Sequence, residues 1–168
     1  MMANTDERSR LHGLLKSFDV AMLVTIAEGG DVHSRPMAIA QVDDDCTVWF
    51  VTSKASAKVR EADSRHRAQV VCQKGWSAFV ALTGRTTVID DSATLDRLWK
   101  KSYEVWFPKG KSDPDVTLMR VDPEEGEYWD ETGTNKLRYL FSAAKAFVSG
   151  TRPTVGGRDE HASVKMKS

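Results

Sequence analysis

The spacing of extended runs along the chain limits its fold more than any other feature. Short apolar and β-branched runs recur at close intervals, and the helical patterns between them are few and irregularly placed. A doubly wound parallel sheet needs strands and helices in regular alternation, so it is disfavoured. The sequence predicts a mainly β fold, an antiparallel β-barrel with peripheral α-helices. Its strands are expected at 21–27, 32–42, 46–52, 68–73, 76–90, 116–121 and 127–132.

Helices are predicted where apolar residues recur at helical spacing. One begins near Thr5, a short one follows Ser56, one starts at Asp91 or Ser92, and the last covers about 136–147. Two features interrupt the extended runs. Gly84 predicts a bulge or sharp bend inside its strand, and Asp122-Pro123-Glu124 is expected to separate the last two strands.

The length and charge of the chain limit the number of domains and the kinds of partner to be expected. A chain of 168 residues suits one domain. We expect that domain at 1–148, followed by a flexible polar tail at 149–168. The 24 basic and 24 acidic residues cancel, which argues against a nucleic-acid or anionic-membrane partner. The first ten residues hold no apolar signal region, and no run approaches the ~20 apolar residues of a membrane span, so a cytoplasmic protein is expected.

The cysteines and histidines show no spacing typical of a metal or redox site. Cys46 and Cys72 lie in apolar runs and are predicted to be plain buried thiols. The histidines are scattered and Asp43-Asp44-Asp45 is interpreted as a solvated turn, so no metal site is predicted. No residue stands out as a catalytic acid or base.

The segment 49–62 runs from a strand through a small polar loop into a helix. Its hydroxyl groups, the free N–H groups of a first helical turn and the ammonium of Lys58 are the parts of a phosphate site. The hydroxyls belong to Thr52, Ser53 and Ser56. The alternative is that Ser56 only caps the helix and that Lys58 is solvated.

Arg35 on the preceding strand is the second candidate for binding an anion, because its guanidinium can contact a phosphate or a carbonyl group. Pro36 removes a backbone donor, which places this part of the strand at an edge, a bulge or a ligand-facing rim. If the strands pair through the turn at 43–45, Arg35 and the loop at 52–58 lie toward the same end of the hairpin. The alternative is that Arg35 is paired with a carboxylate.

Together these motifs resemble a known family. Ser-Arg-Pro-Met at 34–37, followed by Trp-Phe-Val-Thr-Ser-x-x-Ser-x-Lys at 49–58, is similar to the FMN-phosphate signature of the pyridoxamine-phosphate-oxidase-like split barrels. The segments 82–91 and 106–130 resemble the general-stress-protein branch of that family. The resemblance covers roughly residues 11–130.

The resemblance implies a homodimer that holds FMN at the subunit interface. Carried over by position, Arg35 and Lys58 would contact the phosphate with the loop hydroxyls nearby, and the strand backbone around Met37 and Val51 would face the isoalloxazine ring. The two tryptophans at 106 and 129 either stack near the flavin or serve packing and dimer contacts. The full set of implied cofactor contacts is Arg35, Pro36, Met37, Val51, Thr52, Ser53, Ser56, Lys58, Trp106 and Trp129.

The chain also departs from the pyridoxamine-phosphate oxidases themselves. Ala40 and Ala57 replace a lysine and an arginine of those enzymes, and the tail lacks their Arg-x-His substrate motif. A pyridoxal-forming activity is therefore disfavoured. The expectation is an FMN-dependent oxidoreductase of the general-stress type. The alternatives are a flavin-binding stress or sensor protein without turnover, and the same barrel with deazaflavin or haem.

Overall fold

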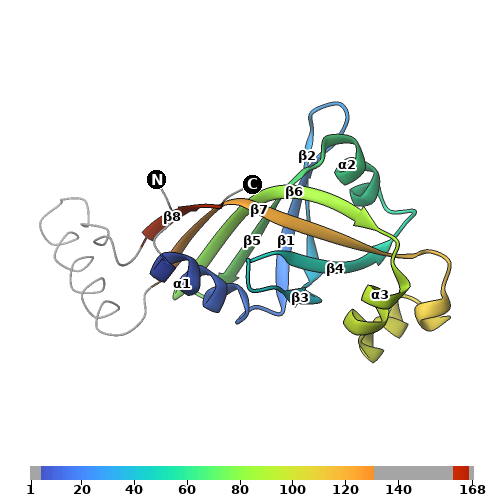
Figure 1. Cartoon of the computed structure of the whole chain (residues 1–168). Coiled ribbons are helices and arrows are strands. Elements are labelled where there is room, and N and C mark those ends of the chain that lie inside the picture. Colours follow the sequence, from blue (N-terminus) through green and yellow to red (C-terminus); the bar gives the residue numbers. More distant parts are fainter. Residues whose placement is uncertain (1–4, 131–160, 167–168) are drawn as a thin grey trace, which may run out of the picture.

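A curled antiparallel sheet forms the body of the protein (Figure 1), and the computed structural model describes residues 5–130 and 161–166. The strands are β1 (Val20–Ile26), β2 (Val32–Ala38), β3 (Gln41–Val42), β4 (Val48–Ser53), β5 (Arg67–Lys74), β6 (Ala78–Ile89), β7 (Val116–Asp130) and β8 (His161–Lys165). The helices are α1 (Thr5–Leu15), α2 (Ala57–Arg65) and α3 (Ser92–Leu98), with 3-10 turns η1 (Lys101–Val105) and η2 (Gly110–Ser112).

The strand order explains how the sheet curls. It runs β2-β1-β5-β6-β7-β4-β3, and β8 also pairs with β7. One edge of β7 pairs with β6, whereas its other edge is shared by β4 along 116–121 and by β8 along 125–129. Every strand pair is antiparallel. The predicted mainly β, antiparallel split barrel with peripheral helices is confirmed.

A bulge allows β7 to run as one long strand. The sequence predicted two strands separated by 122–124, and this prediction is wrong: Val116–Asp130 is continuous. The register with β6 shifts between Thr83 and Gly84, where Thr83 lies opposite Glu125 and Gly84 lies opposite Pro123. A proline is tolerated within a strand at such an irregularity. The bulge predicted at Gly84 is confirmed, and a Cβ at that position would lie 2.1 Å from the Asp122 carbonyl oxygen.

Two other expectations change. The run 32–42 is not one strand, because the ladder breaks after Ala38 and resumes at β3. Only β3 pairs with β4 through the acidic turn. The expected flexible tail at 149–168 is wrong at 161–165, which form β8 on the edge of β7. The helix predicted at 136–147 lies outside the described residues, and the limits of the single domain stay a prediction.

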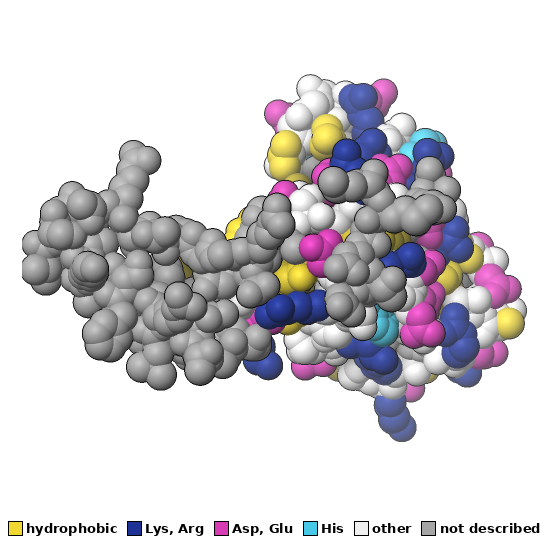
Figure 2. Space-filling view, turned by 60° about the vertical axis from the view of Figure 1, so that its left-hand side comes forward, with side chains coloured by type: hydrophobic (Ala, Val, Ile, Leu, Met, Phe, Trp, Pro, Cys, Tyr) yellow, Lys and Arg dark blue, Asp and Glu magenta, His cyan; other side chains and the backbone are white. Residues whose placement is uncertain are grey.

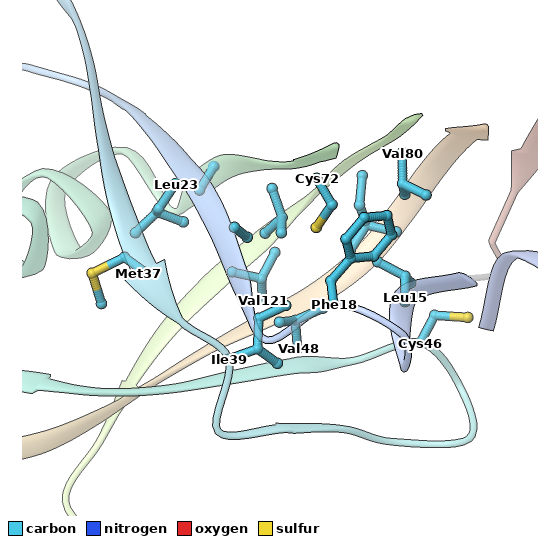
Figure 3. Close-up of a cluster of buried hydrophobic side chains, with 14 of the residues drawn as sticks. Leu15, Phe18, Leu23, Met37, Ile39, Cys46, Val48, Cys72, Val80 and Val121 are labelled. Carbon is cyan, nitrogen blue, oxygen red and sulfur yellow. The ribbon is translucent and has the colours of Figure 1, made fainter. Parts of the chain in front are cut away.

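The core fills the concave side of the sheet. Leu11 and Leu15 of α1 are fully buried, and Phe18 follows them into the same cluster. Figure 3 shows Leu15 and Phe18 reaching in beside Cys72 and Val80 of the sheet. The first predicted helix therefore contributes its apolar face to the closure of the barrel.

The two cysteines are free, buried thiols, as predicted. Burial raises the pKa of Cys46 to about 11 and that of Cys72 to about 12. At neutral pH both are protonated, and a protonated thiol is a poor nucleophile and a poor metal ligand.

The molecular surface shows no broad field of one sign on the face in Figure 2, where basic and acidic side chains are intermixed. This agrees with the formal net charge of zero. None of the helices in the described residues is long and apolar enough to cross a membrane.

Gly84→Ala tests the close backbone approach at the bulge. The added Cβ would collide with the Asp122 carbonyl, which belongs to the backbone and cannot rotate away. We expect a loss of about 3 kcal/mol in the free energy of unfolding, measured by urea denaturation. The matched control is Gly13→Ala in α1, where a Cβ meets nothing within 4 Å. That control should gain about 0.5–1 kcal/mol, and equal effects of the two changes would contradict this account of Gly84.

Candidate functional site

A pocket of about 510 Å³ lies where β2, the end of β4, α2 and η1 meet. We call it the β2–β4 pocket. Its lining residues are Val20, Pro36, Met37, Ala38, Val51, Thr52, Ser53, Lys58, Tyr103, Trp106, Phe107 and Asp115. The structure thus brings the Pro-Met step of β2 and the loop after β4 to one cavity, as the sequence predicted, although β2 and β4 are not neighbours in the sheet.

Most of the pocket wall is apolar, and it opens beside exposed hydrophobic side chains. Met37 and Phe107 are buried, whereas Trp106 is 78% exposed at the rim. A flat, largely apolar ligand with a few polar atoms suits such a wall.

The three hydroxyls predicted to act together have different partners. The Ser56 hydroxyl donates to the Ser53 carbonyl at 2.7 Å, and Ser56 occupies the N-cap position of α2 without a capping hydrogen bond. The side chain of Ser53 is hydrogen-bonded to Asp115, and this contact, with the Ala55 N–H, lowers the pKa of Asp115. Thr52 differs, because its buried Oγ1 has no hydrogen-bond partner among the described residues.

Lys58 brings a positive charge to the pocket from the first turn of α2. No ion pair of Lys58 is found in the described part of the chain. Burial lowers the pKa of Lys58, the nearby charge of Arg35 lowers it further, and Glu61 partly offsets both. An ammonium that is desolvated and repelled by a second cation is stabilised by an anion, so this end of the pocket favours a negatively charged group.

Arg35 is held by the protein itself. Its Nη2 lies 2.9 Å from Glu61 Oε2 and its Nη1 lies 2.5 Å from Thr25 Oγ1. The alternative given for Arg35, that it is paired with a carboxylate, is therefore present in the structure. A guanidinium has five N–H donors, so these contacts leave others for a ligand. Arg35 does not line the β2–β4 pocket, but it influences Lys58, which does.

Glu61 joins α2 to the β1–β2 hairpin. Besides Arg35, it accepts hydrogen bonds from Thr25 and from Nδ1 of His33, the latter at 2.7 Å. Burial alone raises the pKa of Glu61, but these three hydrogen bonds and the Arg35 charge outweigh burial and lower it to about 2. An ionised carboxylate only accepts, so the proton of this contact lies on His33.

The remaining predicted residue, Trp129, lies elsewhere. It pairs with Phe79 across β6 and β7 and is absent from the pocket lining. Five further residues line the pocket and were not predicted from the sequence: Val20, Ala38, Tyr103, Phe107 and Asp115. Tyr103 had a usable signal, because it precedes Trp106 by three residues on a helical turn and so shares its side.

The other candidate binding sites in the described residues are less suited to a ligand than the β2–β4 pocket. A second pocket of about 270 Å³ contains Lys54 and Lys111. These lysines are already paired with Asp90 at 2.6 Å and with Asp96 at 2.5 Å. The described residues hold no cluster of three or more His, Cys, Asp or Glu that suits a metal ion.

Fold and site together define an antiparallel split β-barrel with an apolar pocket and a cation at its edge. The sequence matches the family model "Pyridoxamine 5'-phosphate oxidase like" over residues 6–154. The chain belongs to the pyridoxamine 5'-phosphate oxidase-like family. The resemblance found from the sequence is confirmed.

Its relatives include general stress proteins. General stress protein 26 of Bacillus subtilis (strain 168) is 26% identical over 128 residues, which are 74% of this chain and 89% of that protein. A candidate general stress protein 26 from Jannaschia sp. CCS1 is 28% identical with a TM-score of 0.70, over 96% of this chain and 98% of that one. The general stress FMN/FAD binding protein from Xanthomonas citri is 27% identical with a TM-score of 0.65, over 77% and 93%.

Glu61→Gln tests the ion-pair network at low pH. The folded-state pKa of Glu61, about 2, lies below its ordinary value of 4.5. Its ionised form therefore stabilises the fold fully above pH 4.5, and this contribution is lost as the pH falls toward 2. We expect the variant to lose about 2 kcal/mol at pH 7, and the difference from the wild type to shrink across that acid range in thermal unfolding. Asp90→Asn, which breaks an exposed pair, should change little. A stability difference between Glu61→Gln and the wild type that does not change with pH would contradict the lowered pKa of Glu61.

Proposed function

We propose that the chain binds FMN in the β2–β4 pocket. The observation that carries the proposal is the combination, in one cavity of about 510 Å³, of apolar walls with the partly desolvated ammonium of Lys58, which has no ion-pair partner among the described residues. FMN joins a flat ring system to a phosphate, so its two ends match these two environments. The relative from Xanthomonas citri, named as an FMN/FAD binding protein, supports a flavin.

Within this proposal the phosphate end is assigned to Lys58 and Arg35. Lys58 lines the pocket, and Arg35 is close enough to lower the pKa of Lys58. A phosphate between them would replace repulsion between two cations with attraction to an anion. The ring is assigned to the part of the pocket walled by Met37, Val51 and Trp106. The bound flavin would supply the electron-transfer chemistry.

A comparison of FMN with riboflavin tests the phosphate assignment, because riboflavin has the same ring system and lacks the phosphate. Wild-type protein titrated with FMN should quench flavin fluorescence and yield a yellow holoprotein. Lys58→Met should weaken FMN binding about 10- to 100-fold, the range of a charge-assisted contact, and leave riboflavin binding unchanged.

The control is Lys54→Met, four residues earlier, in the turn between β4 and α2. Lys54 is paired with Asp90 and lies outside the β2–β4 pocket, so its loss should not alter FMN affinity. Wild-type protein that binds no FMN would refute the proposed function. Equal losses for FMN and riboflavin in Lys58→Met would show that the phosphate lies elsewhere.

Turnover is the second part of the proposal: an FMN-dependent oxidoreductase of the general-stress type. The alternative is a flavin-binding protein without turnover, and one observation favours it. The titratable side chains that line the pocket are Lys58, Tyr103 and Asp115, and Asp115 is already hydrogen-bonded within the chain. Anaerobic addition of a reduced nicotinamide to the holoprotein decides between the two, because only an enzyme with that donor bleaches the flavin rapidly.

The proposed assembly is a homodimer with the flavin at the subunit interface. Val20, Met22 and Ile26 point to one side of β1, and these residues are 53%, 39% and 42% exposed. These three residues, the β1 stripe, lie on the outer face of the strand. Val20 also lines the β2–β4 pocket, so the stripe and the pocket are continuous. A second copy seated on the stripe would bury this apolar surface and cover the mouth of the pocket.

Met22→Lys tests the dimer. A charge in the middle of the β1 stripe should shift the protein from dimer to monomer in size-exclusion chromatography with light scattering, because an unpaired charge is costly in an apolar interface. FMN binding should weaken as well. Ser9→Lys, an exposed position on α1, is the control and should stay dimeric. A dimeric Met22→Lys variant would place the interface on another surface.

A further inference from the structure

Tyr103 faces the pocket from η1 and lies in its apolar part. It is buried together with Phe107 and Val116, and Val51 and Trp99 pack against this cluster. The rings of Trp99 and Tyr103 meet edge to face, with centroids 5.6 Å apart and planes at 71°. These contacts fix the direction of the tyrosine ring, so its hydroxyl is held in place rather than free to turn toward solvent.

The Tyr103 hydroxyl is nevertheless unpartnered. It is one of the buried side-chain oxygens that lack a hydrogen-bond partner among the described residues, and the residue is only 8% exposed. Leaving such a group unpaired is unfavourable, and native structures rarely tolerate it without a reason. Thr52 Oγ1 is a second atom of this kind, and Thr52 is a lining residue of the same pocket.

The protonation state of Tyr103 limits what it can recognise. Burial raises the pKa of Tyr103, so the group stays a neutral phenol around neutral pH. A neutral hydroxyl donates a hydrogen bond to a carbonyl oxygen or an aromatic ring nitrogen, and it accepts one as well. The cations that suit a phosphate, Lys58 and Arg35, belong to α2 and β2 and not to this cluster.

We infer that Tyr103 is a ligand-binding residue of the β2–β4 pocket, whose hydroxyl donates a hydrogen bond to a polar atom on the ring system of the bound flavin. Thr52 of β4 has the same role and offers a second neutral hydroxyl. In this assignment Tyr103 binds the ring of the flavin and Lys58 binds its phosphate. The identity of the ring as a flavin rests on the proposed function, whereas the need of Tyr103 for an external partner rests on its burial alone.

Two measurements on Tyr103→Phe test this role. The first is the affinity for FMN and for riboflavin, which share the ring: both should fall by the same factor, roughly three- to ten-fold for one neutral hydrogen bond. The second is the stability of the protein without flavin. It should stay equal or rise, because phenylalanine keeps the ring contacts with Trp99 and removes an unpaired buried hydroxyl.

A pair of threonine variants provides the matched control. Thr52 and Thr117 face each other across β4 and β7, and both are buried, but the Thr117 hydroxyl donates to the Ile89 carbonyl at 3.2 Å. Thr52→Val should behave like Tyr103→Phe. Thr117→Val should lose stability without flavin and keep its flavin affinity.

The results separate this inference from the proposed function. Wild-type binding of FMN with unchanged affinities in Tyr103→Phe, or a loss confined to FMN, overturns the role of Tyr103 while leaving the proposed function intact. Wild-type protein that binds neither flavin overturns the proposed function. In that case the stability measurement still decides: a Tyr103→Phe variant that is destabilised as much as Thr117→Val shows a structural hydroxyl, and a variant that is not destabilised supports a binding hydroxyl.

Discussion

The close contact between two backbones at Gly84 and Asp122 is the constraint on which the barrel depends. A Cβ at Gly84 would lie 2.1 Å from the Asp122 carbonyl, so the two long strands meet here only because the residue is glycine. The register shift beside it divides β7 into two parts with different partners. The part before the bulge pairs with β4 and the part after it pairs with β8. Because β4 ends at the candidate site, the bulge also positions Thr52 and Ser53.

The charged side chains around the pocket differ in how completely they are paired within the protein. Glu61 is buried, ionised and satisfied by Thr25, His33 and Arg35, so it fixes α2 against the β1–β2 hairpin and compensates much of the Arg35 charge. Lys58, one helical turn earlier, has no such partner in the described chain. Within a few residues of α2, the protein therefore carries Glu61, whose ion pair stabilises the fold, and Lys58, whose charge is available to a ligand because it has no ion-pair partner in the described residues.

Local patterns predicted much of the fold and the approximate place of the site. Runs of β-branched residues located most strands, Gly84 located the bulge, and the Pro36-Met37 step and the Thr52–Lys58 loop do meet at one pocket. Facts that depend on distant partners were not predictable. Glu61 lies 26 residues from Arg35, and nothing in the sequence pairs them. The pairing of 161–165 with β7 closes an even longer loop. Similarly, three hydroxyls in one motif looked equivalent, but only their surroundings show that Ser53 and Ser56 are engaged and Thr52 is not.

The two buried thiols have a consequence for a protein whose relatives are general stress proteins. Oxidants attack the thiolate form, and access to the sulfur is also required. Cys46 and Cys72 are the only cysteines in the chain, and both are buried, with pKa values of about 11 and 12. Peroxide or disulfide stress would therefore leave both thiols of the folded polypeptide unmodified. An oxidant added to the folded protein should therefore give no signal from sulfenic acid or disulfide formation.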